Sequence, residues 1–256
     1  MVDCKVASTP AVPGQKLEKS GETHKTDEDV PYQNLIGSLM YLAVCRRPDI
    51  AHTVTHLSQF NTCYTDEHCI SAKRVLRYLK GTKSQGLKYK KTDKMKGLVG
   101  YADASHATSY DRKSFTGLVF LWKGGAVCWE SKKQKTISLS TAEAEYVAIS
   151  EAAREAIFLK RFVAEITGER EKQLTIFSDS QSAVAIAQNP VHHQRTKHID
   201  VRHHYVREAV ENGHIRLVYL ETERMVALVA DVLTKALLKG KFVLCARGMG
   251  MKSLEV

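Results

Sequence analysis

The first third of the chain has hydrophobic residues at helical spacing. Apolar side chains recur every three or four residues across 34–43, again across 49–60 and again across 71–79. This period is typical of amphipathic helices that bury one face. Pro48 interrupts the first pattern, and Gly81 is placed to end the last one. We therefore expect a small helical unit in this part of the chain.

Beyond residue 97 the pattern changes to short apolar runs bounded by turn residues. Three runs come first and predict a meander of strands, with a glycine-rich turn between the second and the third. Helical patterns then alternate with two further strands, an order that predicts an α/β protein with a mixed sheet flanked by helices. The expected strands are 98–102, 116–122, 126–130, 174–178 and 215–220, and the expected helices are 141–166, 182–188, 199–212 and one that ends near Leu238.

These patterns divide the chain into four segments. The N-terminal stretch is polar, contains prolines and has no periodicity, so we expect a flexible lead-in. The segments are the lead-in at 1–31, a helical unit with a basic linker at 32–96, the sheet-containing domain at 97–240 and a C-terminal tail at 241–256.

The composition is that of an ordinary globular protein and argues against several classes. Of the 256 residues, 43% are apolar and 26% are charged, which is enough for a sizeable core. No run approaches the roughly 18 apolar residues of a membrane span, and residues 1–17 lack the apolar core of a signal peptide. The six cysteines have no common zinc spacing. We expect an intracellular protein, cytoplasmic or nuclear and not secreted, with reduced thiols.

The positive charge is concentrated in one stretch. The net charge is +10, and residues 71–96 carry ten basic side chains against one acidic side chain. A stripe of this kind neutralises phosphates and releases counterions, with Arg74, Arg77 and Lys80 on its helical part. The alternative is a solvated basic helix face followed by a lysine-rich loop. The first interpretation predicts a nucleic acid as the partner.

Two aspartates directly follow apolar strands. Asp103 comes after the run 98–102, and Asp179 comes after the run 174–178. In open α/β sheets, ligands bind at the carboxyl ends of the strands, so both aspartates are candidate ligands. The alternatives are a turn role for Asp103 and a helix N-cap for Asp179.

Two further acids lie among apolar residues. Glu145 is at helical spacing from Ala148 and Ala152, whereas Glu143 falls off that stripe. Asp231 lies in a short apolar segment after the last strand. A buried carboxylate needs a partner, and a divalent cation compensates several at once. The alternatives are a favourable interaction with the helix N-terminus for Glu145 and an N-cap or surface role for Asp231. Together, four such acids in a basic protein predict a Mg²⁺ site that receives phosphodiesters.

Ten short motifs along the chain occur in a recognisable order. They are Tyr32–Leu39, Arg47–Ala51, Leu76–Thr82, Gly100–Ser105, Asp111–Ser114, Ser131–Gln134, Leu139–Tyr146, Ser178–Ala183, Arg195–Asp200 and Ala230–Lys235. The later motifs closely resemble the ribonuclease H domain of copia-type LTR retrotransposon Pol polyproteins. The first three resemble the segment behind the polymerase palm in the same polyproteins. The resemblance runs from about residue 3 almost to the end of the chain.

The resemblance implies a ribonuclease H-like fold with a five-stranded mixed sheet, preceded by the helical tail of a reverse transcriptase. It also implies a metal-dependent endonuclease that hydrolyses the RNA strand of RNA–DNA hybrids. The family's catalytic, metal-binding carboxylates correspond to Asp103, Glu145, Asp179 and Asp231. They would hold two Mg²⁺ ions, or Mn²⁺ in their place. A metal-activated water would attack the phosphate in line, and the second ion would stabilise the leaving oxygen.

Two groups of polar residues are candidates for contact with nucleic acid. The first flanks the expected metal ligands and could contact a 2′-hydroxyl, or else bond locally within turns. The second offers phosphate contacts, or else belongs to a surface helix. The first group is Ser105, Ser180 and Gln181, and the second is Arg195, Lys197 and His198. The expected partners are an RNA–DNA hybrid and the rest of the polyprotein, with no membrane and no small-molecule cofactor.

Two departures from the family's pattern leave a second function open. The chain has no Asp-Asp pair, so we expect a C-terminal piece of the polyprotein without polymerase activity. About three extra residues separate Thr222-Glu223 from Ala230. They would displace Asp231, because a shift of one residue turns a helical side chain by about 100°. The alternative function is therefore that of a non-catalytic nucleic-acid-binding remnant of the polyprotein.

Overall fold

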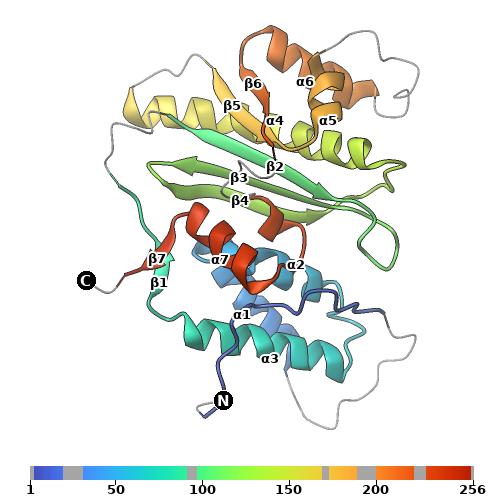
Figure 1. The fold of residues 1–256 in the computed structure, drawn as a ribbon, viewed down its shortest axis with the longest axis vertical. Coiled ribbons are helices and arrows are strands. Elements are labelled where there is room, and N and C mark those ends of the chain that lie inside the picture. The colour runs from blue at the N-terminus through green and yellow to red at the C-terminus, as the bar shows by residue number, and fades with distance from the viewer. Residues whose placement is uncertain are drawn as a thin grey trace.

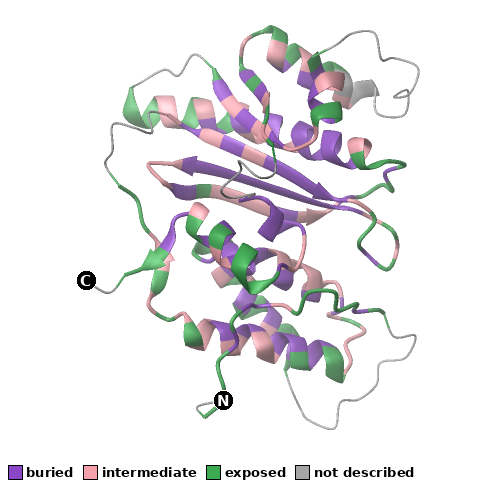
Figure 2. Ribbon diagram, viewed as in Figure 1, coloured by how far each residue is buried: buried purple, intermediate pink, exposed green. Residues whose placement is uncertain are grey.

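The computed structural model describes residues 3–19, 31–90, 97–168, 173–188, 200–221 and 229–254. Its central layer is a sheet with helices on both faces (Figure 1). Figure 2 shows that the buried residues concentrate on the sheet and on the helix surfaces that face it. The sheet therefore separates two hydrophobic cores.

The central sheet consists of β2 (Val99–Ser105), β3 (Phe115–Trp122), β4 (Gly125–Lys133), β5 (Leu174–Ser178) and β6 (Ile215–Tyr219). The strand order is β4-β3-β2-β5-β6. The first three strands form an antiparallel meander, while β5 and β6 run parallel to β2. This arrangement confirms the predicted five-stranded mixed sheet. Lys123 and Gly124 have φ values of 52° and 81°, as a tight hairpin turn requires.

One face of the sheet is covered by α4 (Thr141–Thr167), α5 (Gln181–Gln188) and α6 (Asp200–Glu211) (Figure 1). The buried stripe of α4 is rich in alanine, which allows the helix backbone to lie close to the sheet. This stripe shares a core with Leu118, Phe120 and Ile176. The close packing is what brings Glu145 of α4 onto the sheet.

On the other face lie α1 (Tyr32–Cys45), α2 (Ala51–Ser58) and α7 (Lys239–Gly248), and α3 (Asp66–Gly81) packs behind them, further from the sheet (Figure 1). Their buried residues form one continuous core with Val119, Leu121 and Ala126 of the sheet. Trp129 on β4 also donates a hydrogen bond from Nε1 to the carbonyl of Ala43, at 2.8 Å. The helical unit expected from the sequence is therefore packed directly on the sheet and supplies one of its covering layers.

The C-terminal segment folds back beside this helical unit. A single 3₁₀ turn at Asp231–Leu233 is followed by extended backbone at Leu238, and α7 begins only at Lys239. The predicted helix ending near Leu238 is therefore wrong, because the backbone leaves helical geometry before that residue. After α7, β7 (Met251–Ser253) pairs antiparallel with β1 (Gln85–Leu87). The segment expected to be a plain tail thus contributes a helix and a strand.

Residues 3–19 contain no helix or strand and lie against α3. The Arg77 Nε atom donates a hydrogen bond to the carbonyl of Lys5 at 2.6 Å. The Lys80 Nζ atom donates to the carbonyl of Cys4 at 2.9 Å. Basic side chains of α3 therefore hold the N-terminal segment in place.

A buried charged network connects the helices of this unit. Arg47 donates hydrogen bonds from Nε and Nη2 to the two carboxylate oxygens of Asp49, at 2.9 and 2.8 Å. The Tyr78 hydroxyl donates to the same carboxylate, and Arg47 also donates to the Thr82 hydroxyl. Asp49 is 1% exposed, so this carboxylate is neutralised and hydrogen-bonded inside the core.

Candidate metal centre

The parallel pairing of β2 with β5 brings two aspartates to one edge of the sheet. Tyr101 pairs with Phe177 in this register, so Asp103 and Asp179 each lie two residues further along adjacent strands. Asp103 is 2% exposed and Asp179 is half-buried. The register of β2 with β5 thus sets the distance between these two acids. The sequence showed only that each acid comes after an apolar run.

The beginning of α4 gives its two glutamates different roles. The Ser140 hydroxyl accepts a hydrogen bond from the Glu143 N–H at 3.2 Å, and Glu143 Oε2 accepts one from the Leu139 N–H at 2.8 Å. Glu143 therefore belongs to the helix cap. Glu145 faces the sheet, is 4% exposed and accepts a hydrogen bond from the backbone of Ala104.

Asp103, Glu145 and Asp179 form a compact acidic cluster. One oxygen atom from each of the three side chains lies within 4.8 Å of the others. Among the described residues, none donates a hydrogen bond to the buried Oε2 atom of Glu145. Buried polar atoms are usually paired, so an orphaned carboxylate oxygen fits a site that a bound cation completes.

Burial and mutual repulsion raise the pKa values of all three carboxyl groups. Burial raises the pKa of Asp103 to about 7 and that of Glu145 to about 9, and neighbouring carboxylates add to both shifts. Burial, followed by the charge of Asp231, also raises the pKa of Asp179. The protein itself therefore supplies too little positive charge to hold three ionised carboxylates together. Hard oxygen ligands in this number fit Mg²⁺.

Asp231, the fourth expected ligand, is fully buried but lies outside this acidic cluster. Gly117 on β3 makes room for its turn, since a Cβ atom there would lie 2.7 Å from Thr234 Cγ2. The Lys235 Nζ atom is 3.0 Å from one oxygen of Asp231, and the Lys241 Nζ atom pairs with the other. In this arrangement two lysines neutralise Asp231.

Thr234 and Lys235 lie in the motif Ala230–Lys235, although neither is among the predicted site residues. The Thr234 hydroxyl donates a hydrogen bond to Asp103 Oδ2, and Lys235 Nζ lies 3.7 Å from the same oxygen. One signal was available, because Asp231 and Lys235 are four residues apart, the spacing of acid–base pairs on one helical face. Lys241 reaches Asp231 from α7, and no local pattern indicated that contact.

The acidic cluster opens into a cleft of about 840 Å³ that Ser105, Ser180 and Gln181 also line. The Ser180 hydroxyl accepts a hydrogen bond from the Ala183 N–H at 3.2 Å. Ser180 therefore provides the cap of α5 that the sequence also allowed for Asp179. The Ser105 hydroxyl is buried and bonded within the β2–β3 connection. The Gln181 side chain is exposed at the rim of the cleft.

Arg74, Arg77 and Lys80, the expected contacts on the basic stripe, are not among the described residues that line this cleft. Arg74 donates a hydrogen bond from Nη2 to the Thr9 hydroxyl at 3.1 Å, while Arg77 and Lys80 bind carbonyls of residues 3–19. All three side chains are thus engaged within the protein. Arg195, Lys197 and His198 lie outside the described residues, as do residues 222–228, which include most of the segment with the extra residues before Ala230.

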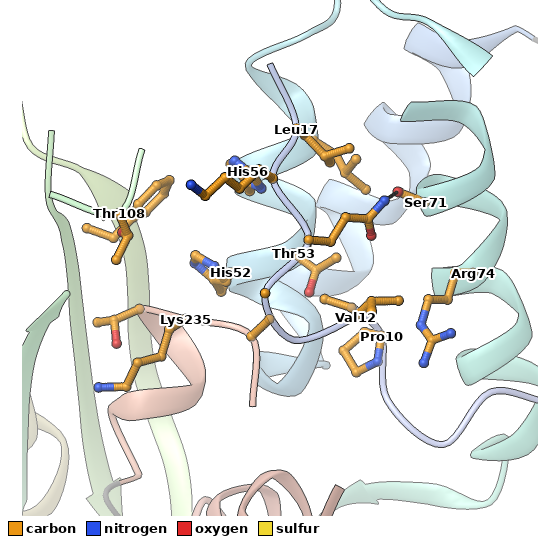
Figure 3. Close-up of a pocket in the computed structure, with 18 of the residues that line it drawn as sticks. Pro10, Val12, Leu17, His52, Thr53, His56, Ser71, Arg74, Thr108 and Lys235 are labelled. Atoms are coloured by element: carbon orange, nitrogen blue, oxygen red, sulfur yellow. Dashed lines mark hydrogen bonds between the residues drawn. The ribbon is translucent and has the colours of Figure 1, made fainter. Parts of the chain in front are cut away.

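A second cavity of about 370 Å³ lies between the helical unit and the sheet. Figure 3 shows Lys235 and Thr108 on one side of it and Arg74 and Ser71 on the other, with His52 between them. Burial lowers the pKa of His52 to about 3, so its ring is neutral at pH 7. Lys235 and Thr108 line both this cavity and the acidic cleft. Lys235 therefore lies at the boundary between the two spaces.

Two solved structures are similar to parts of this chain. The foamy viral protease-reverse transcriptase in complex with double-stranded DNA matches with a TM-score of 0.50 at 14% identity, over 77% of this chain and 33% of that one. LC11-RNase H1, isolated from compost, matches with a TM-score of 0.41 at 20% identity, over 55% of this chain and 94% of that one. The five-stranded sheet with its flanking helices has a ribonuclease H-like fold. Among the described residues, no helix has the length and apolar character needed to cross a membrane.

Comparison of the sequence gives the family. No family model matches the chain. The Pol polyprotein of the transposon TNT 1-94 from Nicotiana tabacum is 42% identical over 259 residues, which cover 99% of this chain and 19% of the relative. The Pol polyprotein of the transposon RE1 from Arabidopsis thaliana is 35% identical over 252 residues, which cover 98% of this chain and 17% of the relative. The chain thus spans about a fifth of the length of these relatives. It belongs to the family of copia-type retrotransposon Pol polyproteins.

Proposed function

We propose that this chain acts as the ribonuclease H part of a copia-type polyprotein and hydrolyses the RNA strand of RNA–DNA hybrids. The proposed cofactor is Mg²⁺, with Mn²⁺ able to replace it, and the proposed ligands are Asp103, Glu145 and Asp179. A nuclease of this kind is a hydrolase that needs no small-molecule cofactor besides the ion. The proposal assigns no polymerase activity to the chain, since its sequence has no Asp-Asp pair.

The observation that carries the proposal is the acidic cluster itself. Three carboxylates lie within 4.8 Å of one another in an open cleft, one from β2, one from the residue after β5 and one from α4. Burial raises their pKa values, and the Glu145 Oε2 atom has no donor among the described residues. A structural role would favour carboxylates whose buried oxygens all have donors, whereas a cation site favours a buried oxygen without one, such as Glu145 Oε2.

A divalent ion in such a site activates a water molecule and stabilises charge on the phosphate oxygens. The chain's own residues would orient the ion, because β2, β5 and the packed helix α4 hold the three carboxylates in place. Thr234 holds Asp103 through its hydroxyl, which limits rotation of that carboxylate. Gln181 at the cleft rim is placed to contact the sugar of a bound strand, and a contact to a 2′-hydroxyl would distinguish RNA from DNA.

Cleavage of a labelled RNA–DNA hybrid by the purified chain in Mg²⁺ tests this function. We expect cleavage by the wild-type chain and a cleavage rate at least about a hundredfold lower in Asp179→Asn. Loss of a residue that only supports a metal ligand already lowers activity by up to about a hundredfold. Glu151→Gln is a matched control, since Glu151 lies on α4 outside the cluster and pairs with Arg154. Equal cleavage by wild-type and Asp179→Asn chains would refute the assignment.

A non-catalytic hybrid-binding role is the second candidate, and the surroundings of Asp231 favour it. Lysines occupy both oxygens of this carboxylate, and it lies outside the cluster. Binding of the hybrid in Ca²⁺ and its cleavage in Mg²⁺ separate the two candidates. Tight binding of the hybrid without any cleavage would support the non-catalytic role. Cleavage that depends on Asp179 would exclude that role.

A further inference from the structure

Lys235 lies between two carboxylates that belong to different parts of the fold. Its Nζ atom is 3.0 Å from Asp231 Oδ1 and 3.7 Å from Asp103 Oδ2. Its backbone N–H donates a hydrogen bond to the carbonyl of Asp231 at 3.1 Å. The 3₁₀ turn thus fixes the start of the lysine side chain, and the two carboxylates fix its end.

The surroundings keep this lysine charged. The carboxylates of Asp231 and Asp103 both lie close to its ammonium and favour the positive charge. The second cavity lies on the other side of this ammonium, and the described residues that line it include no acid. The ammonium therefore points toward Asp103 and Asp231. A fixed positive charge therefore joins the acidic cluster to Asp231.

An ion held by Asp103 and Asp231 would need the same oxygen atoms. Mg²⁺ binds carboxylate oxygens at about 2.0–2.1 Å. An ammonium close to both oxygens excludes the ion sterically and repels it electrostatically. Glu145 and Asp179 have no such competitor among the described residues, because the ion pairs of Lys235 and Lys241 are with Asp103 and Asp231. The two halves of the expected four-carboxylate site thus differ in the cation that they can take.

We propose that the Lys235 ammonium takes the place of a second divalent ion between Asp103 and Asp231, so that the chain binds one divalent ion instead of two. The inference rests on the proposed metal site at Asp103, Glu145 and Asp179. Lys235 is then a positioning residue that supplies one fixed positive charge at the edge of the cleft. The extra residues before Ala230 do not enter this argument.

Lys241 offers a matched control for charge. It pairs with the other oxygen of Asp231 and forms no ion pair with Asp103, and its side chain is 45% exposed against 39% for Lys235. Lys241→Met therefore removes the same charge from the same aspartate without opening the space between the two carboxylates. A count of bound ions distinguishes the two positions.

The experiment counts Mn²⁺ ions bound to the metal-free full chain by the loss of the free-ion electron paramagnetic resonance signal. We expect one ion for the wild-type chain, two for Lys235→Met and one for Lys241→Met. Lys235→Gln repeats the test with a polar side chain of similar reach, in case the methionine variant does not fold. Circular dichroism melting verifies that each variant is folded before ions are counted.

Each outcome of the count has one meaning. Two ions on the wild-type chain, or one ion on both Lys235 variants, would overturn the role of Lys235 and leave the metal site standing. Two ions on Lys241→Met as well would show that the charge of Asp231, and not the position of Lys235, sets the number. No ion on the wild-type chain would instead refute the proposed metal site itself.

Discussion

Two groups of buried carboxylates in this protein have opposite surroundings. Asp49 accepts hydrogen bonds from two nitrogens of Arg47 and from the hydroxyl of Tyr78. In the acidic cluster, a lysine lies 3.7 Å from Asp103, and one oxygen of Glu145 has no donor among the described residues. Asp49, Asp103 and Glu145 are each at most 4% exposed, so the difference between these three lies in their partners and not in their burial.

The comparison shows how a buried acid can be assigned a role. A carboxylate whose charge is matched inside the protein is tolerated in the core, and removal of its partner destabilises the fold. A group of carboxylates without enough matching charge is unfavourable until something binds. Burial by itself therefore does not indicate a functional site, whereas burial without partners does.

The largest effect is expected for Asp49→Ala, which leaves Arg47 charged and unpaired in the core. We expect a loss of about 3–5 kcal/mol in the free energy of unfolding, measured by urea denaturation. The double variant Arg47→Met with Asp49→Leu should recover most of that loss, because no buried charge remains. A loss below about 1 kcal/mol would make this network equivalent to an exposed ion pair.

A divalent ion should stabilise the acidic cluster in the same way that Arg47 stabilises Asp49. At a Mg²⁺ concentration of a hundred times its Kd, binding to the folded state alone adds about 2.7 kcal/mol. Thermal melting with and without Mg²⁺ measures this gain, which should be absent from Asp103→Asn. An equal gain in that variant would place the ion elsewhere in the protein.

Stability without metal should depend on pH in a definite direction. Burial first, and then neighbouring carboxylates, raise the pKa of Glu145 from 4.5 to about 9 in the folded state. The folded state therefore holds this proton more tightly than the unfolded state, and stability falls as pH rises between those two values. In EDTA the melting temperature should decrease over this range.

The variant Glu145→Gln tests that assignment, since it removes the titrating group and keeps the shape of the side chain. We expect a flatter profile, with a remaining decrease that ends near the folded pKa of Asp103, which is about 7. Asp49→Ala should lower stability at every pH and leave the slope unchanged. An unchanged slope in Glu145→Gln would contradict the raised pKa of this residue.

The smallest effect is expected for Glu143→Ala, two residues from the cluster. Loss of this cap contact should cost about 1 kcal/mol of stability and leave Mn²⁺ binding unaltered, because Glu143 bonds the backbone of Leu139. Glu145→Ala should instead abolish Mn²⁺ binding. A loss of Mn²⁺ binding in Glu143→Ala would mean that both glutamates serve the site.

Several parts of the site could be predicted from local sequence. Asp103 and Asp179 were recognisable because each follows an apolar strand, and the parallel register of β2 with β5 places them side by side. Glu145 was recognisable because it continues the buried stripe of α4. The mixed sheet followed from the order of strand and helix patterns. Each of these inferences uses periodicity over a few residues.

Contacts between distant segments were not predictable in this way. Arg77 and Lys80 bind backbone carbonyls more than seventy residues away, although their sequence pattern alone favoured a phosphate-binding stripe. The helical unit shares a core with the sheet, although the pattern suggested a separate segment. The predicted helix near Leu238 was wrong, since packing and not propensity decides the path of that segment.

The sequence by itself determined which side chains carry charge and which faces of the helices and strands are apolar. Only the tertiary structure decided which charges meet, because Lys241 reaches Asp231 from another helix and Lys235 reaches Asp103 from another segment. Hydrophobic periodicity is a local property, whereas the energy of a buried charge depends on everything that surrounds it. The number of cations at this site is therefore a property of the folded protein.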